Sequence, residues 1–323
     1  MKHQRLILIL IAVYLTACHH IPEITLDVRT CPSPPEGRAS AICFAIEDTV
    51  YILGGRNSEN QKTSTLMKYS HAKQTWSEVQ PTPLTARVNG VAYSNANIAY
   101  VGLGYTGASI YEDKNHLRDW WKYNPKTQQW TRLADFPTNK TVSAVAFGND
   151  QCIWVGFGFN GFSDELWCYS IEDNEWREET HQKVWPRRLM GSVATSVGNR
   201  HYLGTGYRRH AFSEWWEWLE EEHCWESRSP VPGKGRHNAA CAATSEVCWV
   251  IGGWHYGDSL TNGFHYADIL RYSPLSDQWT VCGTIPCGGT ENGVACGIGN
   301  TLYFGLGENE KGELHQKWYR IEE

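Results

Sequence analysis

The sequence predicts an all-β protein of six four-stranded blades around one axis, a six-bladed β-propeller whose last blade is closed by an N-terminal strand. Two observations indicate this fold. A glycine pair, a polar loop, an aromatic strand, a turn and a tryptophan recur in that order along most of the 323 residues, and a fixed repeat period determines the architecture. The composition, with 30 Gly, 16 Trp and 16 Tyr, is typical of short strands joined by tight turns.

The first 17 residues are predicted to be a signal peptide. A short basic segment precedes the apolar run 6–15, which is too short to span a bilayer as a helix. The ending Leu-Thr-Ala-Cys resembles a bacterial lipobox, in which the cysteine, here Cys18, is acylated and begins the mature chain. The resemblance implies a diacylated lipoprotein held on a membrane by its N-terminus. The alternative is an ordinary secretory peptide that ends near a cysteine.

Residues 18–36 are expected to hold the lipid attachment site and the strand that closes the propeller. The sixth unit ends after three strands at 318–321, and a propeller with an incomplete last blade would leave open sheet edges. The alternating stretch 24–28 precedes the first unit and aligns with the Trp76 strand. We therefore expect this stretch to be the missing fourth strand, with 37–323 forming the propeller and no second domain.

The first unit shows the expected order of strands. A small-residue strand at 39–45 leads through a turn to a second strand at 50–53, which ends in a glycine pair. A polar loop, a third strand at 66–69 and a fourth strand at Trp76 follow. Later units begin near Arg87, Thr141, Arg188, Arg236 and Glu291, and the fourth-strand tryptophans are Trp76, Trp130, Trp176, Trp225 and Trp279. The sixth unit lacks this tryptophan.

These units resemble kelch repeats. The matching features are the glycine doublet that closes the second strand, the third strand that ends in tyrosine, and the tryptophan that follows it. The resemblance covers essentially residues 37–321, although four of the six doublets are Gly-x-Gly. It implies that the glycines lie near the narrow axis and that the tryptophans belong to the core of the blades.

Ten cysteines remain besides Cys18, an even number that permits disulfides in an exported chain. Cys43, Cys241 and Cys296 are predicted to be equivalent, small, buried residues of three repeats. Cys282 and Cys287 are close enough in sequence for a local bridge. No cysteine or histidine spacing is typical of a zinc site, so we expect no metal and no cofactor.

A ligand site is expected on the face with the blade crossings and the long loops 105–118 and 254–267, since function usually resides on such loops. Two rings of residues should meet there near the axis. The candidate ligand-binding residues are Arg38, Arg87, Asn89, Arg188, Arg236, His237, Asn238 and Asn292 at the starts of first strands, and Tyr105, Phe159, Tyr207, Trp254 and His255 after the glycine pairs.

Arginines bind carboxylates and aromatic rings stack on sugars, so these residue types favour a carbohydrate or an anionic small molecule. Alternatively, the arginines pair with neighbouring carboxylates or carbonyls and line a water-filled channel. The aligned carboxylates Asp119, Glu165, Glu214 and Asp268 are predicted to have such a structural role. The pair His255 and His265 is a weak candidate for metal binding or acid–base chemistry, because no helix fixes their spacing.

The formal net charge of −6 gives no global indication of nucleic-acid binding. We expect a monomeric, non-enzymatic, lipid-anchored module of the bacterial cell envelope that binds a small ligand or a protein. The histidines that follow Cys18 give no acidic inner-membrane retention signal, which favours the outer membrane, facing the periplasm or the surface.

An alternative is a sugar isomerase of the mutarotase or epimerase type. Exported six-bladed kelch proteins include a family similar to the sialic acid mutarotases, and that resemblance implies an anionic sugar in the propeller mouth. It assigns no catalytic residue in this chain. A copper radical oxidase similar to galactose oxidase shares the kelch blade, but it requires a tyrosine–cysteine cross-link, a copper ligand set and seven blades.

Overall fold

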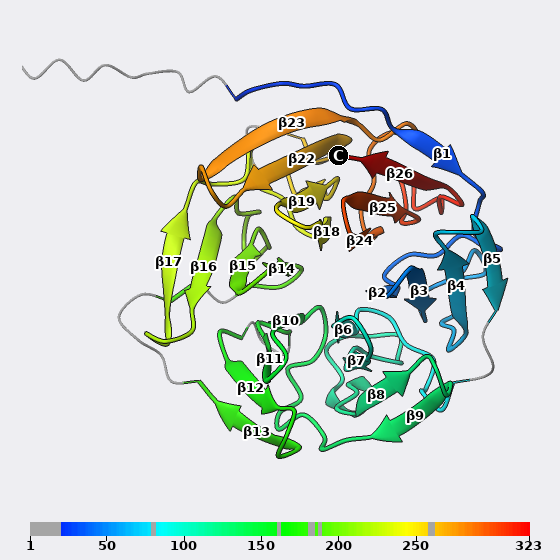
Figure 1. Ribbon diagram of the computed structural model, residues 1–323, viewed down its shortest axis with the longest axis vertical. Helices are drawn as coiled ribbons and strands as arrows, with labels where there is room; N and C mark the ends of the chain where they lie inside the picture. The colour runs from blue at the N-terminus through cyan, green and yellow to red at the C-terminus, as the bar shows by residue number, and fades with distance from the viewer. Residues whose placement is uncertain (1–20, 79–81, 160–162, 180–184, 187–188, 258–261) are drawn as a thin grey trace, which may run out of the picture.

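The computed structural model describes residues 21–78, 82–159, 163–179, 185–186, 189–257 and 262–323. This part of the chain forms six four-stranded antiparallel sheets around a central axis (Figure 1), which confirms the all-β, six-bladed propeller. Its single helical element is the short 3-10 helix η1 (Asp113–Asn115). The same residues include no helix with the length and apolar character needed to cross a membrane.

Each blade runs from an inner strand at the axis to an outer strand at the rim. Blades 1 to 3 consist of β2 (Ile42–Ile46), β3 (Thr49–Leu53), β4 (Leu66–Ser70) and β5 (Thr75–Glu78); β6 (Val91–Ser94), β7 (Ala99–Gly102), β8 (Trp120–Asn124) and β9 (Gln129–Arg132); and β10 (Val145–Gly148), β11 (Cys152–Gly156), β12 (Leu166–Ser170) and β13 (Glu175–Glu178).

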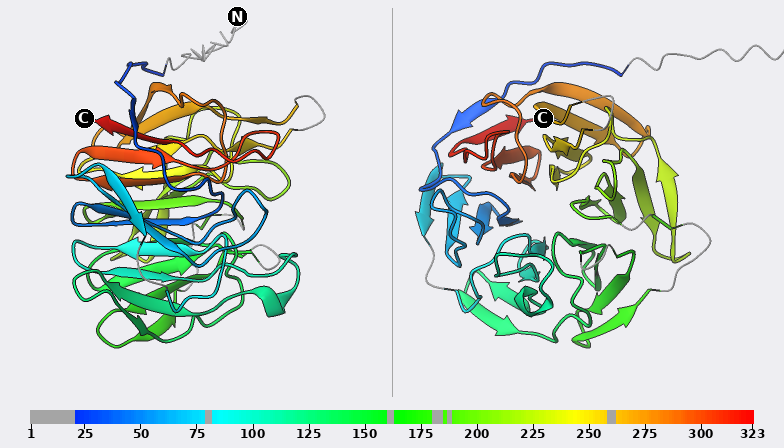
Figure 2. Two further views of the ribbon diagram at one scale, coloured as in Figure 1. Left: turned by 90° about the vertical axis from the view of Figure 1, so that its right-hand side faces the viewer. Right: turned by 180° about the vertical axis from the view of Figure 1, so that it is seen from behind.

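Blades 4 to 6 consist of β14 (Val193–Val197), β15 (Arg200–Gly204), β16 (Trp215–Leu219) and β17 (Cys224–Arg228); β18 (Ala240–Ala243), β19 (Cys248–Ile251), β22 (Asp268–Ser273) and β23 (Gln278–Thr284); and β24 (Val294–Ile298), β25 (Thr301–Gly305), β26 (Trp318–Glu322) and β1 (Arg29–Cys31). A separate hairpin, β20 (Trp254–His255) with β21 (Phe264–His265), projects from blade 5. In the side view of Figure 2, the loop that carries η1 and the C-terminus lie at opposite ends of the disc.

The N-terminal segment closes the last blade, as expected, but with different residues. Strand β1 pairs antiparallel with β26 and becomes the outer strand of blade 6. The predicted strand 24–28 is wrong in position, because the amides of Ile24 and Leu26 instead bond along the edge of β23 in blade 5. Leu26 and Val28 pack against the core between blades 5 and 6. The apolar alternation of Leu26 and Val28 therefore reflects packing against the core between blades 5 and 6 and not pairing with β26.

The fourth-strand tryptophans belong to the packing of the blades, with Trp225 and Trp279 buried in the core and Trp76, Trp130 and Trp176 partly buried against it. Each packs at a tilt against the aromatic residue opposite it in the third strand, with centroid distances of 4.5–5.2 Å in the pairs Tyr69–Trp76, Tyr123–Trp130, Tyr169–Trp176, Trp218–Trp225 and Tyr272–Trp279. Three indole N–H groups donate to carbonyls of an adjacent blade or crossing, from Trp76 to Pro32, Trp176 to Ala134 and Trp279 to Ser229. The rings thus fill each blade and also join it to its neighbour.

Six equivalent residues form a backbone ring around the axis, here called the axial ring: Ser40, Asn89, Ser143, Gly191, Asn238 and Asn292. All six have left-handed φ values between 50° and 63°, a conformation that asparagine and glycine tolerate better than most residues. Amide-to-carbonyl bonds of 2.9–3.1 Å connect five of the members to the preceding blade, including Ser40 to Asn292 across the closure. The ring therefore joins the inner ends of the blades.

The cysteines differ from expectation in two respects. Cys43 and Cys241 share an inner-strand position with Ala92, Ala146, Ala194 and Ala295, whereas Cys296 lies one residue farther along and faces blade 1. The sixth unit has Thr290 at the position where the first, second and fifth units have arginine. The sequence therefore lacked the residue that would have aligned the inner strand of this unit, and with it Cys296, with the other units. A disulfide joins Cys152 to Cys168, and Cys282 and Cys287 are free thiols.

Candidate functional site

In every blade, the residue after the glycine doublet pairs with the residue just before the axial ring. The six backbone bridges are Ala39–Arg56, Val88–Tyr105, Val142–Phe159, Met190–Tyr207, His237–Trp254 and Glu291–Glu308. The glycines permit this close approach, since a Cβ at Gly104 would lie 2.4 Å from the carbonyl oxygen of Val88. The structure thus brings the two expected rings of residues together at the long-loop end of the axis.

The geometry that the buried arginines share directs them away from the axis. Arg38, Arg87 and Arg236 are at most 1% exposed and turn into their own blades. Arg87 donates to both carboxylate oxygens of Asp119 at 2.7 Å, and Arg236 donates to both of Asp268 at 2.6 and 2.8 Å. These guanidinium groups are therefore used within the fold. Arg188 lies outside the described residues.

Each buried arginine also binds the backbone of its glycine doublet. Arg38 donates to the carbonyl of Gly54 at 2.9 Å, as Arg236 does to Gly252 and, at 3.1 Å, Arg87 to Leu103. Burial alone would raise the pKa of Asp119, but the hydrogen bonds and charge of Arg87 lower it. The arginines thus hold the turn after the second strand against the start of the third strand, the structural alternative that the sequence left open.

Aromatic side chains from blades 4 and 5 gather beside the axis. His237 lies 5.1 Å from the ring of Tyr207 and 5.2 Å from that of Trp254, centroid to centroid. Tyr256 lies 5.2 Å from Tyr207 and 5.4 Å from Trp254. Tyr207 and Trp254 are partly exposed and Tyr256 is 45% exposed. Ring faces are therefore available to solvent at the long-loop end.

A polar group adjoins these rings. His265 lies 5.9 Å from Trp254, and its Nε2 is 3.4 Å from Oε1 of Glu291. Asn238 donates from Nδ2 to the other carboxylate oxygen of Glu291 at 3.0 Å. We call the set Tyr207, His237, Asn238, Trp254, Tyr256, His265 and Glu291 the axial cluster. It combines aromatic faces with one carboxylate in a single small area.

Two pKa shifts set the charges of the axial cluster at neutral pH. Burial lowers the pKa of His237 to about 4, and the nearby charge of Glu291 only partly opposes this effect. Burial would raise the pKa of Glu291, but hydrogen bonds from His265 and Asn238 lower it. The cluster therefore contains a neutral imidazole at position 237 and an ionised carboxylate at position 291.

The next blade continues the polar part of the surface. Asn292 donates to Oε1 of Glu308 at 3.1 Å, and Arg56 forms an ion pair of 2.5 Å with Oε2 of the same carboxylate. The arginine that follows the first glycine doublet is thus neutralised. The charges of Arg56, Glu291 and Glu308 sum to −1.

Other candidate residues occupy different places. Tyr105 lies under Lys62, whose Nζ is 5.1 Å from the ring, and Phe159 contacts Tyr111 at 5.6 Å. His255 is buried and its Nδ1 is 3.1 Å from the carbonyl oxygen of Gly235. Asn89 belongs to the axial ring. Of the thirteen candidates, the axial cluster contains Tyr207, His237, Asn238 and Trp254, with Asn292 beside them.

Three members of the axial cluster lay outside the thirteen ligand-binding candidates: Tyr256, Glu291 and His265, of which His265 was expected only as a weak candidate for metal binding or acid–base chemistry. A sequence signal existed for Glu291, because the equivalent residues Ala39, Val88, Val142 and Met190 are apolar. A charged residue at a position that is usually apolar indicates a local role. His265 is placed by the hairpin of β20 and β21, whose pairing brings it opposite Trp254. Bridges in four other blades place Lys62, His116, Ala211 and Leu314 at the equivalent position.

A cavity of about 570 Å³ lies on the axis at the opposite end. The inner strands of all six blades line it with small side chains, among them Cys43, Ala92, Ala146, Ala194 and Cys241, and the rim carries Glu47, Asn95, Asp150 and Asn199. The lining begins about three residues beyond the axial ring in each strand, so the ring separates this cavity from the axial cluster. Sequence reasoning missed it, because the turns at that end are short.

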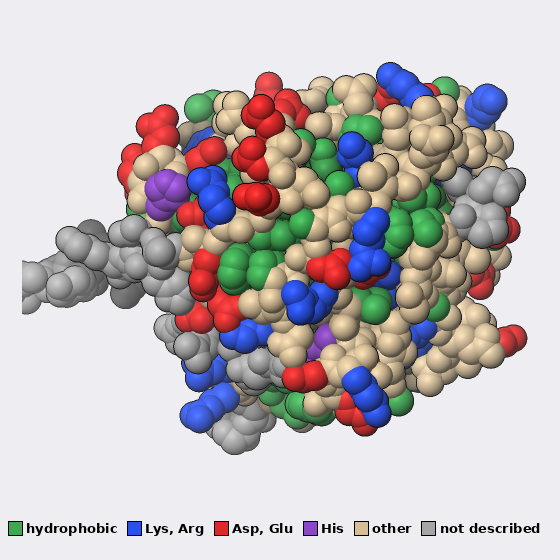
Figure 3. All heavy atoms as spheres, turned by 90° about the horizontal axis from the view of Figure 1, so that it is seen from below, with side chains coloured by type: hydrophobic (Ala, Val, Ile, Leu, Met, Phe, Trp, Pro, Cys, Tyr) green, Lys and Arg blue, Asp and Glu red, His purple; other side chains and the backbone are tan. Residues whose placement is uncertain are grey.

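Charged side chains are mixed elsewhere on the molecule. On the side of the disc seen in Figure 3, acidic and basic groups alternate with small apolar areas, and no single charge dominates. No group of three or more potential metal ligands occurs among the residues that the structure describes.

Comparisons with known proteins agree with the fold. The family model of the kelch motif matches residues 38–83, which span blade 1 and part of its crossing to blade 2. The chain is similar to Kelch-like protein 25 of Xenopus tropicalis (25% identical over 275 residues, 83% of this chain and 44% of the relative) and to Kelch-like protein 23 of Pongo abelii (22% over 280 residues, 85% and 47%). The chain thus spans about half the length of these relatives.

Two further proteins extend the comparison. Kelch-like protein terF of Aspergillus terreus is 22% identical over 294 residues, which are 82% of this chain and 59% of that protein. Among solved structures, that of YjhT superposes with a TM-score of 0.73 at 17% identity and covers 89% of this chain and 95% of that chain. At this level of identity the likeness concerns the fold alone.

Proposed function

We propose that this kelch β-propeller is a lipid-anchored binding module of the bacterial cell envelope and that the axial cluster binds a carbohydrate. The observation that carries the proposal is the grouping of the exposed or partly exposed rings of Tyr207, Trp254 and Tyr256 with His265, which connects Trp254 to the carboxylate of Glu291. Aromatic faces pack against the apolar face of a sugar ring, and a carboxylate and an amide orient its hydroxyl groups.

The charges favour a neutral sugar over an anion. Three of the four arginines that suggested an anionic ligand, Arg38, Arg87 and Arg236, are buried in ion pairs and bonded to backbone carbonyls, and Arg56 is paired with Glu308. An anionic sugar at this end would lie near two carboxylates, Glu291 and Glu308, and the guanidinium group of Arg56 is already paired with Glu308. Repulsion between like charges in a partly buried site would oppose its binding.

The experiment is calorimetric titration of the mature chain with a panel of neutral and acidic mono- and oligosaccharides. Trp254→Ala and Tyr207→Ala should each weaken binding at least about 10-fold, which corresponds to the loss of one stacking contact of about 1.4 kcal/mol. The matched control is Tyr105→Ala, which changes the equivalent position in blade 2 outside the axial cluster. If no sugar binds, or if Tyr105→Ala weakens binding as much as Trp254→Ala, the proposed site is wrong.

The cavity at the opposite end provides a second comparison. Ala146→Phe would place a large side chain in that cavity, and we expect it to leave sugar affinity unchanged. Loss of binding in Ala146→Phe with full binding in Trp254→Ala would move the site to the cavity.

A second candidate function is a sugar isomerase of the mutarotase type. The contact that favours it is the 3.4 Å approach of His265 to Glu291, since opening and closing of a sugar ring needs one proton acceptor and one proton donor. Glu291, held ionised, would accept the proton. Exchange spectroscopy on equilibrated anomers should then show faster interconversion with the protein present and loss of the effect in Glu291→Gln. Unchanged exchange rates with every sugar that binds would rule this candidate out.

The proposed envelope location rests on the N-terminal sequence, which lies outside the described residues. Cys18→Ser should shift the protein from the membrane fraction to the soluble fraction after cell lysis. A protein partner is the other class of ligand that kelch relatives suggest. Because Tyr256 is exposed in the axial cluster, binding of a protein there would also be weakened by Tyr256→Ala.

A further inference from the structure

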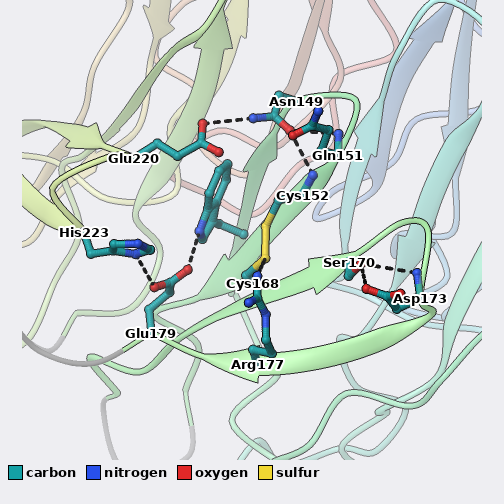
Figure 4. The surroundings of a disulfide bond; sticks show 11 residues. Asn149, Gln151, Cys152, Cys168, Ser170, Asp173, Arg177, Glu179, Glu220 and His223 are labelled. Atoms are coloured by element: carbon teal, nitrogen blue, oxygen red, sulfur yellow. Dashed lines mark hydrogen bonds and ion pairs between the residues drawn. A yellow bond between two sulfur atoms is a disulfide. The ribbon is translucent and has the colours of Figure 1, made fainter.

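The disulfide between Cys152 and Cys168 lies at the wall of a cavity of about 480 Å³ (Figure 4). Both cysteines line this cavity, together with Gln151, Ser170, Arg177 and Glu220. The cavity is at the side of blade 3 that faces blade 4 and is separate from the axial cluster. A small molecule can therefore approach the sulfur atoms without separation of the blades.

The strands that carry the two cysteines are held together independently of the disulfide. Strands β11 and β12 pair over five residues, from Cys152 opposite Ser170 to Gly156 opposite Leu166. They are the two middle strands of blade 3, so β10 and β13 hold their outer sides. The sheet will therefore keep the sulfur atoms close together when the bond is reduced, and the bond can form again.

A cation lies next to one of the sulfur atoms. Arg177 of β13 is opposite Cys168 of β12, and its Nη2 is 3.9 Å from the sulfur of Cys168. Figure 4 shows this side chain beneath the disulfide. A positive charge stabilises a thiolate, so the sulfur of Cys168 is the better leaving group of the two.

Three other charged groups around the cavity have their own partners. Glu220 accepts a hydrogen bond from Asn149 at 3.0 Å, and Asp150 accepts one from Asn95 at 3.0 Å. Glu179 accepts a bond from Trp154 at 3.0 Å and pairs with His223 at 2.9 Å. Glu172 also lines the cavity. Arg177 is therefore the charged group that the described contacts place against the sulfur.

We propose that the Cys152–Cys168 disulfide is a thiol–disulfide exchange site that reacts with small thiols from this cavity. An incoming thiolate attacks the sulfur of Cys152, the more exposed of the two at 8% against 2%. The new S–S bond forms as the Cys152–Cys168 bond breaks, and its electron pair goes to Cys168 as a thiolate beside Arg177. A second thiol then attacks the mixed disulfide, which releases the oxidised small disulfide and leaves both cysteines reduced.

The test incubates the folded, full-length mature protein with cysteine or reduced glutathione as the small thiol. Free cysteines are blocked first, newly reduced ones are then trapped with iodoacetamide, and the labelled peptides are quantified by mass spectrometry. Cys152 and Cys168 should become labelled faster than the protein unfolds, as measured by hydrogen exchange of the core strands under the same conditions. Labelling that only follows global unfolding would overturn the proposal.

Two variants separate an exchange site from a merely accessible disulfide. Arg177→Gln should slow reduction about 3- to 10-fold, because the leaving thiolate loses its neighbouring cation. Arg132→Gln, an exposed arginine of the outer strand in blade 2, should leave the rate unchanged. In Cys168→Ser, oxidised glutathione should form a mixed disulfide on Cys152. Equal reduction rates in Arg177→Gln and Arg132→Gln would contradict the role of Arg177. Absence of a glutathione adduct on Cys152 in Cys168→Ser would contradict attack at Cys152.

Discussion

Cys31 lies opposite Trp318 in the antiparallel pair of β1 and β26, so a residue near the start of the chain completes the blade formed by its end. Both side chains are buried in the core between blades 6 and 1, where Tyr69 and Tyr303 also pack. The indole of Trp76 reaches across to the carbonyl of Pro32 at 2.8 Å. The closing strand is thus held by its ladder, by core packing and by the neighbouring blade.

A chain that begins at residue 33 should be less stable than one that begins at residue 21. It loses the pairing with β26 and the burial of Cys31, together about 3 kcal/mol, which corresponds to a decrease in Tm of roughly 5–10 °C. Thermal unfolding followed by circular dichroism measures this difference. A chain that begins at residue 29 keeps β1 and is the control. Equal Tm values for the starts at 29 and 33 would show that β1 does not stabilise the closure.

Asp119→Asn should destabilise the protein strongly. The substitution removes the carboxylate that pairs with the fully buried Arg87 and leaves that charge without compensation, at a cost of about 3–5 kcal/mol. Urea unfolding gives the value. The control is Asp27→Asn, which affects an exposed pair with Arg29 and should change stability by less than about 1 kcal/mol. Similar effects of the two substitutions would contradict the structural role of Arg87.

Stability should decrease between pH 6.5 and pH 4 because of two buried histidines. Burial lowers the pKa of His201 and of His237 from 6.5 to about 4, so the unfolded chain binds more protons than the folded chain in this window. Each histidine contributes stability that is present above pH 6.5 and is lost as pH falls towards 4. At pH 4.5 the loss is about 2–3 kcal/mol for each.

The measurement is urea unfolding at pH 7.0 and pH 4.5. His201→Gln should reduce the difference between the two pH values by about 2–3 kcal/mol relative to the unsubstituted chain. His210→Gln changes an exposed histidine and should leave the difference as it is. A difference that persists unchanged in His201→Gln would exclude His201 as a source of acid sensitivity.

At Gly191 of the axial ring, any side chain larger than that of glycine should destabilise the protein. This residue has φ of 63°, and a Cβ there would lie 2.4 Å from Oδ1 of Asn238. Gly191→Ala should therefore destabilise the protein by about 1–3 kcal/mol in urea unfolding. The matched change, Ser40→Gly, removes a Cβ at the equivalent position with φ of 56° and should alter stability by less than about 1 kcal/mol. A larger loss of stability in Ser40→Gly than in Gly191→Ala would mean that the left-handed backbone does not limit which side chains the axial ring accepts.

Much of the fold follows from local patterns. The spacing from Tyr69 to Trp76 and from Tyr272 to Trp279 recurs because a two-strand hairpin needs the same turn length in every blade. The functional face was only partly predictable. Tyr207 and Trp254 were expected together because they share a repeat position, whereas His265 reaches the axial cluster by pairing with Trp254 across the long loop of blade 5, which no residue pattern in the sequence marks.

The sequence by itself determined the all-β architecture, the number of blades, the tryptophan core and the closure by an N-terminal strand, because each depends on a periodic pattern of residue types. Tertiary structure decided that Arg87 turns towards Asp119 and not towards the axis, that β1 and not the stretch 24–28 pairs with β26, and that Cys152 bonds Cys168. The physical reason is common to the three. A repeat fixes which strands form and which face is buried, but the partner of one side chain depends on the distances set when the sheets assemble.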